Sequence, residues 1–436
     1  MRMVKELTRK MKDSGVDWIG EIPKDWKVQN LKSILEERNE MNNPIKTESI
    51  LSLTNDRGVI PYSEKGDIGN KSKEDLSKYK LAYPNDIVVN SMNVIIGSVG
   101  LSDYFGATSP VYYMLYVRDN KDSIHYYNYL FQTKEFQSKL VGYGNGIMEH
   151  RMRIPMLNLN KVHLPYPKSF EQKSIADFLD EKTQEIDNII SKTKKAIEEY
   201  KRYKQSLITE TVTKGLDKNV QMKDSEIEWI GKIPENWDVS KIKYFYNITL
   251  GKMLQPRQRN NDETKEYYIS AINIQDDVDL SIEKQMWFSK NEKSMYKIEK
   301  GDLLTVEGGH AGKSILWEYS NLDKEYYFQN SILRARNKFN SDNRFLKYWM
   351  QSLRGVGYLD YICNKATIVH FTREKYLNTE IVVLDYKEQE QIASYLDKKC
   401  SQIDQIISTK EKFLREMEAY KKSLIYETVT GKREVE

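Results

Sequence analysis

The sequence predicts an α+β protein: two mixed α/β domains joined by two long helices that form an antiparallel coiled coil, with an internal pseudo-twofold repeat. Three observations predict this fold. A tryptophan motif occurs twice, a long helical pattern occurs twice, and in each half of the 436-residue chain a β-rich region lies between motif and helix. We expect a first domain at 1–168, a first helix at 169–215, a second domain at 216–385 and a second helix at 386–436.

The first repeated segment is short and rich in tryptophan. VDWIGEIPKDWKV, residues 16–28, returns as IEWIGKIPENWDV, residues 227–239. The shared residues are shifted by 229 − 18 = 211 positions. They are Trp18, Gly20, Pro23 and Trp26, which recur as Trp229, Gly231, Pro234 and Trp237.

The second repeated segment predicts a long helix in each half. One copy starts at Phe170 and the other at Lys387, a shift of 387 − 170 = 217 positions. Neither contains proline or an internal glycine, and both are dense in Glu, Lys, Gln and Ala, which are good helix formers. Asp187 and Asp404 recur at equivalent places, and we expect them to be solvated or to cap.

Apolar and aromatic residues recur in these helices at heptad spacing, which predicts a coiled-coil seam. The alternative is that each helix packs only on its own domain, but this would leave much of the apolar stripe in water. The predicted seam consists of Leu179, Ile186, Ile189, Tyr200, Tyr203, Leu207, Leu396, Ile403, Ile406, Phe413, Met417, Tyr420 and Leu424.

The regions between motif and helix, about 34–168 and 245–385, contain short β-rich runs separated by Gly, Asn and Asp turns. They share an outline, because YPNDIVVN around Asp86 resembles EKGDLLTV around Asp302. Their other residues diverge widely. This pattern predicts a common scaffold with two different surfaces.

Composition excludes several classes of protein. The net charge of +4 excludes a histone-like polycation but permits local basic faces. Two cysteines, Cys363 and Cys400, cannot form a disulfide framework or a cysteine-rich zinc site. The N-terminus lacks the apolar core of a signal peptide, and no apolar stretch approaches the length of a membrane span. We expect a cytoplasmic protein without a membrane segment.

The search for catalytic motifs predicts a chain that is not an enzyme and holds neither metal nor cofactor. GGHAGKS at 308–314 has three residues between Gly308 and the Gly-Lys-Ser, whereas a phosphate loop has four. We expect a glycine-rich loop that presents His310 and Lys313. No histidine pair has metal-ligand spacing, and no nucleophile elbow or methyl-transfer motif occurs.

Basic and amide side chains on predicted turns and strands are the candidate binding residues. Arg334 and Arg336 alternate along a predicted strand, which would place both on one face. Arg and Lys hold phosphates, Arg reads guanine, and Asn or Gln reads adenine. The alternative is ordinary solvated surface. The candidate DNA-binding residues are Lys71, Lys73, Asn90, Asn93, Asn145, Arg151, Arg153, Lys252, Arg257, Gln258, Arg259, Asn260, His310, Lys313, Arg334, Arg336 and Arg373.

Together, the WIGEIPxxW motif, the variable region and the EQxxIAxxLD…ID…YKxSLIxETVT helix, all present twice, resemble the specificity subunit of type I restriction-modification systems, the HsdS family. The resemblance covers nearly the whole chain. Its most specific parts are the helix starts at Glu171-Gln172 and Glu388-Gln389 and the ETVT stretches at Glu210 and Glu427. The second domain departs from the pattern by lacking the LPxP sequence before its helix.

The resemblance implies two target-recognition domains, each reading one half of a bipartite site in double-stranded DNA, with the paired helices fixing the spacer. It implies docking of two methyltransferase subunits that use S-adenosylmethionine and modify adenine. Complexes that also cleave DNA add restriction/translocase subunits, which use ATP and Mg. Two other interpretations stay open: a protein-binding scaffold with a duplicated coiled-coil architecture, and a chain that itself methylates or cuts DNA.

Overall fold

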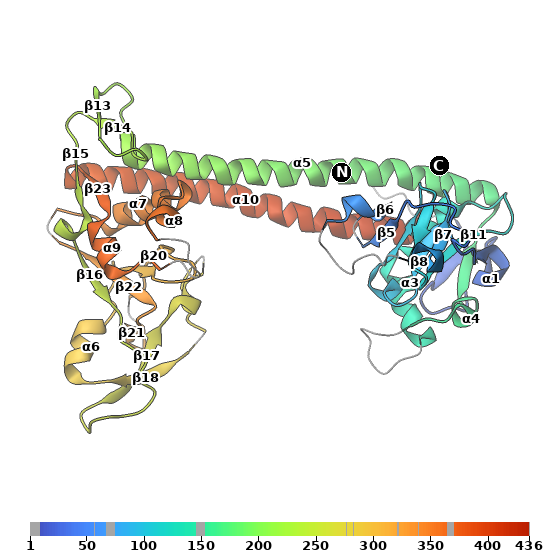
Figure 1. Ribbon diagram of the computed structural model, residues 1–436, viewed down its shortest axis with the longest axis horizontal. Helices are drawn as coiled ribbons and strands as arrows, with labels where there is room; N and C mark the ends of the chain where they lie inside the picture. The colour runs from blue at the N-terminus through green and yellow to red at the C-terminus, as the bar shows by residue number, and fades with distance from the viewer. Residues whose placement is uncertain are drawn as a thin grey trace. The chain divides into compact units, whose positions relative to one another are not determined.

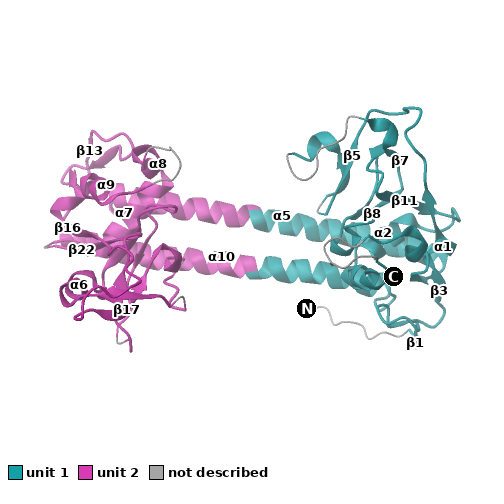
Figure 2. Cartoon of the chain, turned by 60° about the horizontal axis from the view of Figure 1, so that its bottom comes forward, with its two compact units in different colours: residues 1–194, 412–436 teal, residues 195–411 magenta. Residues whose placement is uncertain are grey.

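The computed structural model describes residues 9–55, 57–66, 75–144, 153–275, 277–281, 283–320, 322–338, 340–363 and 370–435 (Figure 1). The chain forms two compact units, of which the first is made of two separate stretches of sequence (Figure 2). Unit 1 comprises residues 1–194 and 412–436, and unit 2 comprises residues 195–411. Each unit therefore contains one α/β module (module 1 before α5, module 2 between α5 and α10) and one part of each long helix. In the described ranges, no helix is long and apolar enough to cross a membrane.

The two modules contain the same four-stranded antiparallel sheet. The strand order is β4-β11-β8-β9 in module 1 and β16-β22-β19-β20 in module 2. The third strand of each sheet is buried along its whole length. The bounds are β4 Leu35–Arg38, β11 Tyr112–Val117, β8 Ile87–Asn90, β9 Val99–Leu101, β16 Tyr246–Leu250, β22 Ile332–Asn337, β19 Leu303–Val306 and β20 Ser314–Leu316. The shared outline around Asp86 and Asp302 thus corresponds to a shared sheet.

Shorter elements surround each sheet. In module 1 they are β1 Met11–Asp13, β2 Glu21–Pro23, β3 Lys27–Asn30, α1 Leu31–Ile34, β5 Leu51–Thr54, β6 Gly58–Pro61, β7 Lys80–Ala82, β10 Gly106–Thr108, α2 Ile124–Phe131, α3 Lys134–Lys139, α4 Met156–Leu159 and β12 His163–Tyr166. In module 2 they are β13 Met222–Asp224, β14 Lys232–Pro234, β15 Asp238–Lys241, β17 Thr264–Ile269, β18 Gln285–Phe288, α6 Lys290–Tyr296, β21 Tyr326–Phe328, α7 Asn343–Gly355, α8 Tyr358–Ile362, α9 Arg373–Asn378 and β23 Glu380–Val383.

The long helices α5, Ser169–Lys214, and α10, Tyr386–Val429, pair with each other in both units. In unit 1, Lys421 Nζ lies 2.7 Å from the carboxylate of Asp187. In unit 2, Lys204 Nζ lies 2.6 Å from the carboxylate of Asp404, and Lys410 Nζ lies 5.8 Å from the ring centroid of Tyr200. Position numbers rise on α5 as they fall on α10, which confirms the antiparallel pairing. Both aspartates are also more than half exposed, as expected for solvated side chains, and each forms an ion pair across the two helices.

The buried isoleucines of the two helices follow an eleven-residue repeat rather than the predicted heptad. On α5, isoleucines at intervals of 11 are at most 5 % exposed: Ile175, Ile186, Ile197 and Ile208. On α10, Ile392, Ile403 and Ile425 lie 11 and then 22 positions apart and are at most 7 % exposed, and the half-buried Leu414 fills the place between the last two. Eleven residues make three turns at about 3.67 residues per turn, close to the period of a straight helix, so the seam needs no left-handed supercoil.

The predicted seam residues therefore differ widely in burial. Leu179, Ile186, Leu396, Ile403 and Leu424 are buried. Tyr200, Leu207 and Met417 are half-buried. The remaining predicted residues are 39–57 % exposed, because a strict seven-residue spacing drifts around a straight helix. These are Ile189, Tyr203, Ile406, Phe413 and Tyr420.

The start of each long helix binds its own tryptophan motif. The indole nitrogen of Trp26 donates to Glu171 (2.9 Å), and that of Trp237 donates to Glu388 (3.1 Å). Both indoles are at most 1 % exposed. Each copy of the tryptophan motif thus binds the start of the long helix in its own half, which explains why the motif and the helix occur together twice.

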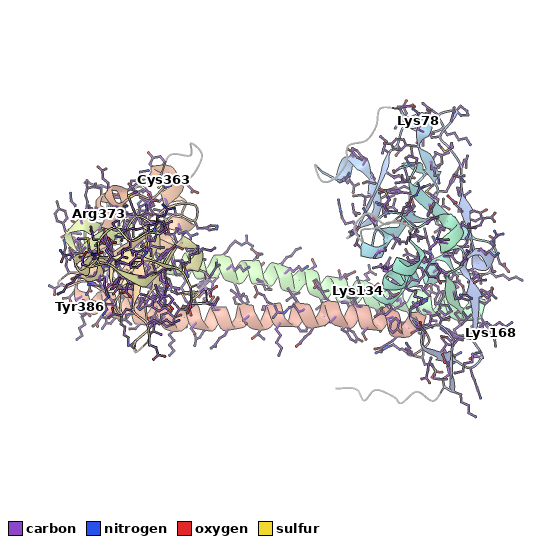
Figure 3. The ribbon with its side chains drawn as sticks, turned by 90° about the horizontal axis from the view of Figure 1, so that it is seen from below. Lys78, Lys134, Lys168, Cys363, Arg373 and Tyr386 are labelled. Carbon is purple, nitrogen blue, oxygen red and sulfur yellow. The ribbon has the colours of Figure 1, made fainter. Side chains whose placement is uncertain are left out.

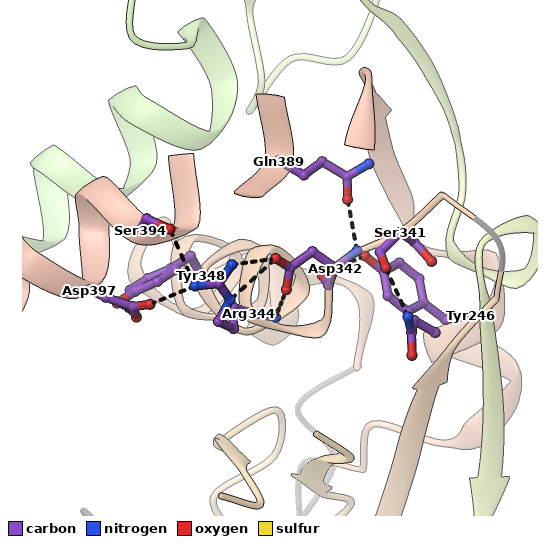
Figure 4. Close-up of polar contacts among 9 residues, drawn as sticks. Tyr246, Ser341, Asp342, Arg344, Tyr348, Gln389, Ser394 and Asp397 are labelled. Carbon is purple, nitrogen blue, oxygen red and sulfur yellow. Dashed lines mark hydrogen bonds and ion pairs between the residues drawn. The ribbon is translucent and has the colours of Figure 1, made fainter. Parts of the chain in front are cut away.

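The glutamine after each of these glutamates anchors the module to its helix. Gln389 accepts a hydrogen bond from the backbone N–H of Asp342 (3.1 Å), and the nearby Tyr348 hydroxyl donates to Asp397 on α10 (2.7 Å; Figure 4). In module 1, Gln172 accepts from the Ser123 N–H at 2.9 Å. The EQ pair that is most specific to the sequence pattern thus has a structural role in both halves.

Candidate nucleic-acid interface

Each module presents a loop between the last two strands of its sheet. In module 1 this loop follows β8, and Asn93 and Ile96 are exposed on it. Asn90 is only 8 % exposed and accepts a hydrogen bond from the Met92 N–H (3.0 Å), so it shapes the turn. In module 2 the loop between β19 and β20 carries His310, which is exposed, and Lys313, which is half-buried. The predicted glycine-rich loop therefore has a structural counterpart in module 1.

A second segment lies against this loop in both modules. The N–H of Ile154 donates to the carbonyl of Ser91 (2.9 Å), and the N–H of Phe371 donates to the carbonyl of Glu307 (2.7 Å). These bonds place the exposed Arg153 beside the first loop and His370 beside the second. Two connected segments therefore form a polar edge on each module.

The edge of module 2 contains an acid and a histidine that the sequence did not single out. The Nδ1 atom of His370 lies 3.0 Å from a carboxylate oxygen of Glu307, and His370 is half exposed. A carboxylate can accept from the amino group of cytosine, whereas Arg153 of module 1 would favour guanine or phosphate. The candidate residues in the sequence are basic and amide side chains on predicted turns and strands, so they do not include Glu307 and His370.

The two strand arginines bind partners inside module 2, which argues against their predicted role as DNA contacts: Arg334 is buried and Arg336 is half-buried. Arg334 is 7 % exposed and donates to the Lys297 carbonyl (2.7 Å); this burial lowers the pKa of Arg334. Arg336 donates to both carboxylate oxygens of Asp302 at 2.7 and 2.8 Å, and this pairing raises the pKa of Arg336. Their guanidinium groups are used in contacts within the module.

The aspartates of the shared outline hold an arginine in both modules. Asp86 is 1 % exposed and pairs with Arg38 at 3.0 Å, as Asp302 pairs with Arg336. The Arg38 guanidinium also lies 4.5 Å from the ring centroid of Tyr83. The arginine comes from β4 in module 1 but from β22 in module 2. Because the two arginines are not at equivalent sequence positions, aligning the aspartates did not reveal the shared ion pair.

An exposed cationic segment of module 2 is residues 256–262, here called the arginine loop. Arg257, Gln258, Arg259 and Asn260 are all exposed. Within the described residues, neither arginine forms an ion pair. Lys252, predicted as a fifth DNA contact in this stretch, is 6 % exposed and bonded to other side chains. Its burial argues against contact with DNA.

The remaining candidates divide into exposed residues and residues outside the described ranges. Arg373, labelled in Figure 3, is exposed at the start of α9 and donates through Nε to the Ile248 carbonyl (2.8 Å). Lys71, Lys73, Asn145 and Arg151 lie outside the described residues. Among the described residues, no group of three His, Cys, Asp or Glu side chains could hold a metal ion.

Comparison with known proteins identifies the family. The family model described as "Type I restriction modification DNA specificity domain" matches residues 23–199 and 234–414. A Methanocaldococcus jannaschii protein assigned as the specificity subunit of the type I restriction enzyme MjaX is 26 % identical over 95 % of both chains. The MjaVIII specificity subunit of the same organism is 23 % identical, covering 94 % of this chain and 93 % of that one.

Solved structures share the fold. A chain from a structure on the assembly and conformational transition of a type I R-M system aligns with a TM-score of 0.69 at 11 % identity. The crystal structure of the HsdS subunit from Thermoanaerobacter tengcongensis aligns with a TM-score of 0.54, also at 11 % identity. Each match covers 94 % of this chain and 98 % of the other. Because the family model matches both halves of the repeat, the chain belongs to the family of type I restriction-modification DNA specificity proteins.

Proposed function

We propose that this chain is the DNA specificity subunit of a type I restriction-modification complex, and that each module reads one half of a bipartite DNA sequence. The observation that carries this proposal is that one sheet order occurs twice with different exposed side chains. A local twofold axis in a protein matches the twofold axis of a DNA duplex. Because the two surfaces differ, the half-sites differ in sequence.

The exposed side chains supply two kinds of contact. The exposed Arg257 and Arg259 suit phosphates and guanine, while Asn93 of module 1 suits adenine. Phosphate contacts give most of the affinity and make it sensitive to salt. Base contacts, worth about 1–3 kcal/mol each, give the choice of sequence.

The paired helices act as the ruler that fixes the spacer between the half-sites. The seam repeats every eleven residues, so a whole repeat can be removed from both helices while the isoleucine spacing is kept. Deleting 190–200 from α5 and 409–419 from α10 shortens each helix by about 16 Å, at about 1.5 Å per residue. The expected result is a shorter spacer, by at most about 5 base pairs at about 3.4 Å each, with both half-sites unchanged. Changed half-sites with an unchanged spacer would contradict the ruler.

The exposed apolar residues of the helices provide docking sites for two methyltransferase subunits. Ile189 and Tyr420 are 41 % and 46 % exposed in unit 1, where the Asp187–Lys421 ion pair brings their helical turns together. Their equivalents at a shift of 217 are Ile406 (39 % exposed) and Tyr203 (57 % exposed), both in unit 2. Two equivalent patches suit two copies of one partner, which would supply S-adenosylmethionine and the catalytic step. The specificity chain itself is then not an enzyme.

Sequencing the methylated bases of the host genome, with and without this gene, tests the proposal. We expect one bipartite adenine-methylated motif to disappear with the gene. Binding of the purified chain to random duplex DNA at low and high salt separates the proposal from a protein-binding scaffold. A DNA-binding chain shows a steep salt dependence, and a flat dependence would favour the scaffold.

A further inference from the structure

A buried polar network lies next to the arginine loop of module 2. Lys252, Gln255 and Glu263 are 6 %, 4 % and 6 % exposed. Lys252 Nζ donates to the side-chain oxygen of Gln255 (2.9 Å), and the Gln255 amide nitrogen lies 2.9 Å from both oxygens of Glu263. Lys252 also forms an ion pair with Glu292 of α6. The network is therefore tied to a helix outside the loop.

The network holds the loop through its backbone. One carboxylate oxygen of Glu263 accepts from the N–H of Arg259 (2.7 Å) and from the N–H of Asn260 (3.3 Å). The Gln255 side chain donates to the carbonyl of Arg257 at 3.2 Å. The backbone donors, Arg259 first, lower the pKa of Glu263, so its carboxylate stays ionised at neutral pH. The backbone of the two exposed arginines is thus held by hydrogen bonds to the buried side chains of Gln255 and Glu263.

A buried carboxylate beneath two exposed arginines is unusual for a loop whose only role is to bind DNA by charge. A carboxylate under a cationic surface repels phosphate and weakens DNA binding unless it contributes something else. Glu263 makes its hydrogen bonds to amide groups, and neither loop arginine neutralises it within the described residues. A loop that is already ordered loses less conformational entropy when its long side chains bind.

We propose that Glu263 and Gln255 are positioning residues that hold Arg257 and Arg259 in place for the DNA half-site read by module 2. This inference rests on the proposed function and adds a residue role to it. Lys252 links the network to α6 and acts within the fold. Glu263 acts through the arginines and not by touching DNA.

The test compares two variants of acidic residues, of which only one is expected to weaken DNA binding. Glu263→Ala and the neighbouring Asp262→Ala each remove one negative charge, but Asp262 is exposed and outside the network. Binding of the full chain is measured by fluorescence anisotropy on a duplex that carries the motif found by methylome sequencing. Two further duplexes carry one scrambled half-site each. Thermal unfolding of each variant is measured in parallel.

We expect Glu263→Ala to bind the intact duplex at least about fivefold more weakly, as for the loss of one arginine contact. Asp262→Ala should bind equally well or more tightly. The weakening should remove discrimination at one half-site, the same one that the Arg257→Ala/Arg259→Ala double variant affects. Glu263→Gln keeps an acceptor for the two backbone N–H groups and should recover most of the affinity. Adding Glu263→Ala to the double variant should change affinity less than about twofold, because the network then has no arginines to position.

Two results would overturn the inference alone: wild-type affinity in Glu263→Ala, or an equal loss with and without the arginines. The second result would mean that Glu263 supports the fold rather than the contact. If the wild-type chain does not prefer the motif duplex over a scrambled one, the proposed function fails and this inference fails with it.

Discussion

The register of the helix seam can be tested with two isoleucines eight positions apart on α5. Ile197 is 5 % exposed and belongs to the eleven-residue repeat, whereas Ile189 is 41 % exposed and belongs only to the heptad pattern. Replacing a buried isoleucine by alanine costs about 2–5 kcal/mol through lost burial and a cavity. At Ile189 much of the side chain is already in water, so we expect a loss of less than about 1 kcal/mol. The gain in helix propensity from alanine is the same at both sites.

Hydrogen–deuterium exchange of the α5 amides is the suitable assay, because a chain with two units does not unfold in a single step. Ile197→Ala should accelerate exchange in the middle of α5 about thirtyfold or more, and Ile189→Ala less than about fivefold, since about 1.4 kcal/mol corresponds to a factor of ten. Ile186→Ala is the positive control, because both registers bury Ile186. A larger effect at Ile189 than at Ile197 would refute the eleven-residue seam.

Three further predictions concern other parts of the two units. Gln389→Ala should destabilise unit 2 by about 2–4 kcal/mol, measured by hydrogen–deuterium exchange of its amides, because two or more buried backbone groups lose their partner; the exposed Gln391→Ala is the control, and equal effects would contradict the anchor. Burial raises the pKa of Cys400 from 9.0 to about 11, so the neutral thiol stabilises the fold below pH 9 and this contribution disappears as pH rises toward 11. The stability of the wild type relative to Cys400→Ala should therefore fall by about 1.3 kcal/mol between pH 8 and pH 10; a constant difference would show that the thiol is not shifted. Asp187→Lys should cost at most about 1 kcal/mol, because the Asp187–Lys421 pair is partly exposed, and adding Lys421→Asp should restore stability; no recovery in the double variant would argue against a pairwise contact.

The duplicated plan could be predicted because it depends on local signals. The two long helices contain neither proline nor internal glycine, and their propensity alone predicts them. The antiparallel pairing follows from the twofold repeat. The heptad register could not be excluded from the sequence, since Ile186 and Ile403 fit both periods and only burial distinguishes Ile189 from Ile197.

The candidate interface was predicted less well. The sequence shows that a residue is charged, but it does not show whether that residue is exposed or paired with another side chain of the fold. Lys252 and Arg257 lie in one stretch of sequence, yet the first is buried against Glu292, 40 positions away, and the second is exposed. Arg336 likewise finds Asp302, 34 positions away and directly before the neighbouring strand β19. Glu263 gave no sequence signal, because its role consists of bonds to backbone N–H groups.

Exchange of one module tests the central claim most directly. Residues 34–168 are replaced by the corresponding region of another member of the family, and the methylated motifs of the host are sequenced. The two-reader account predicts that one half-site changes while the other half-site and the spacer length stay the same. A change in both half-sites, or in the spacer, would contradict it.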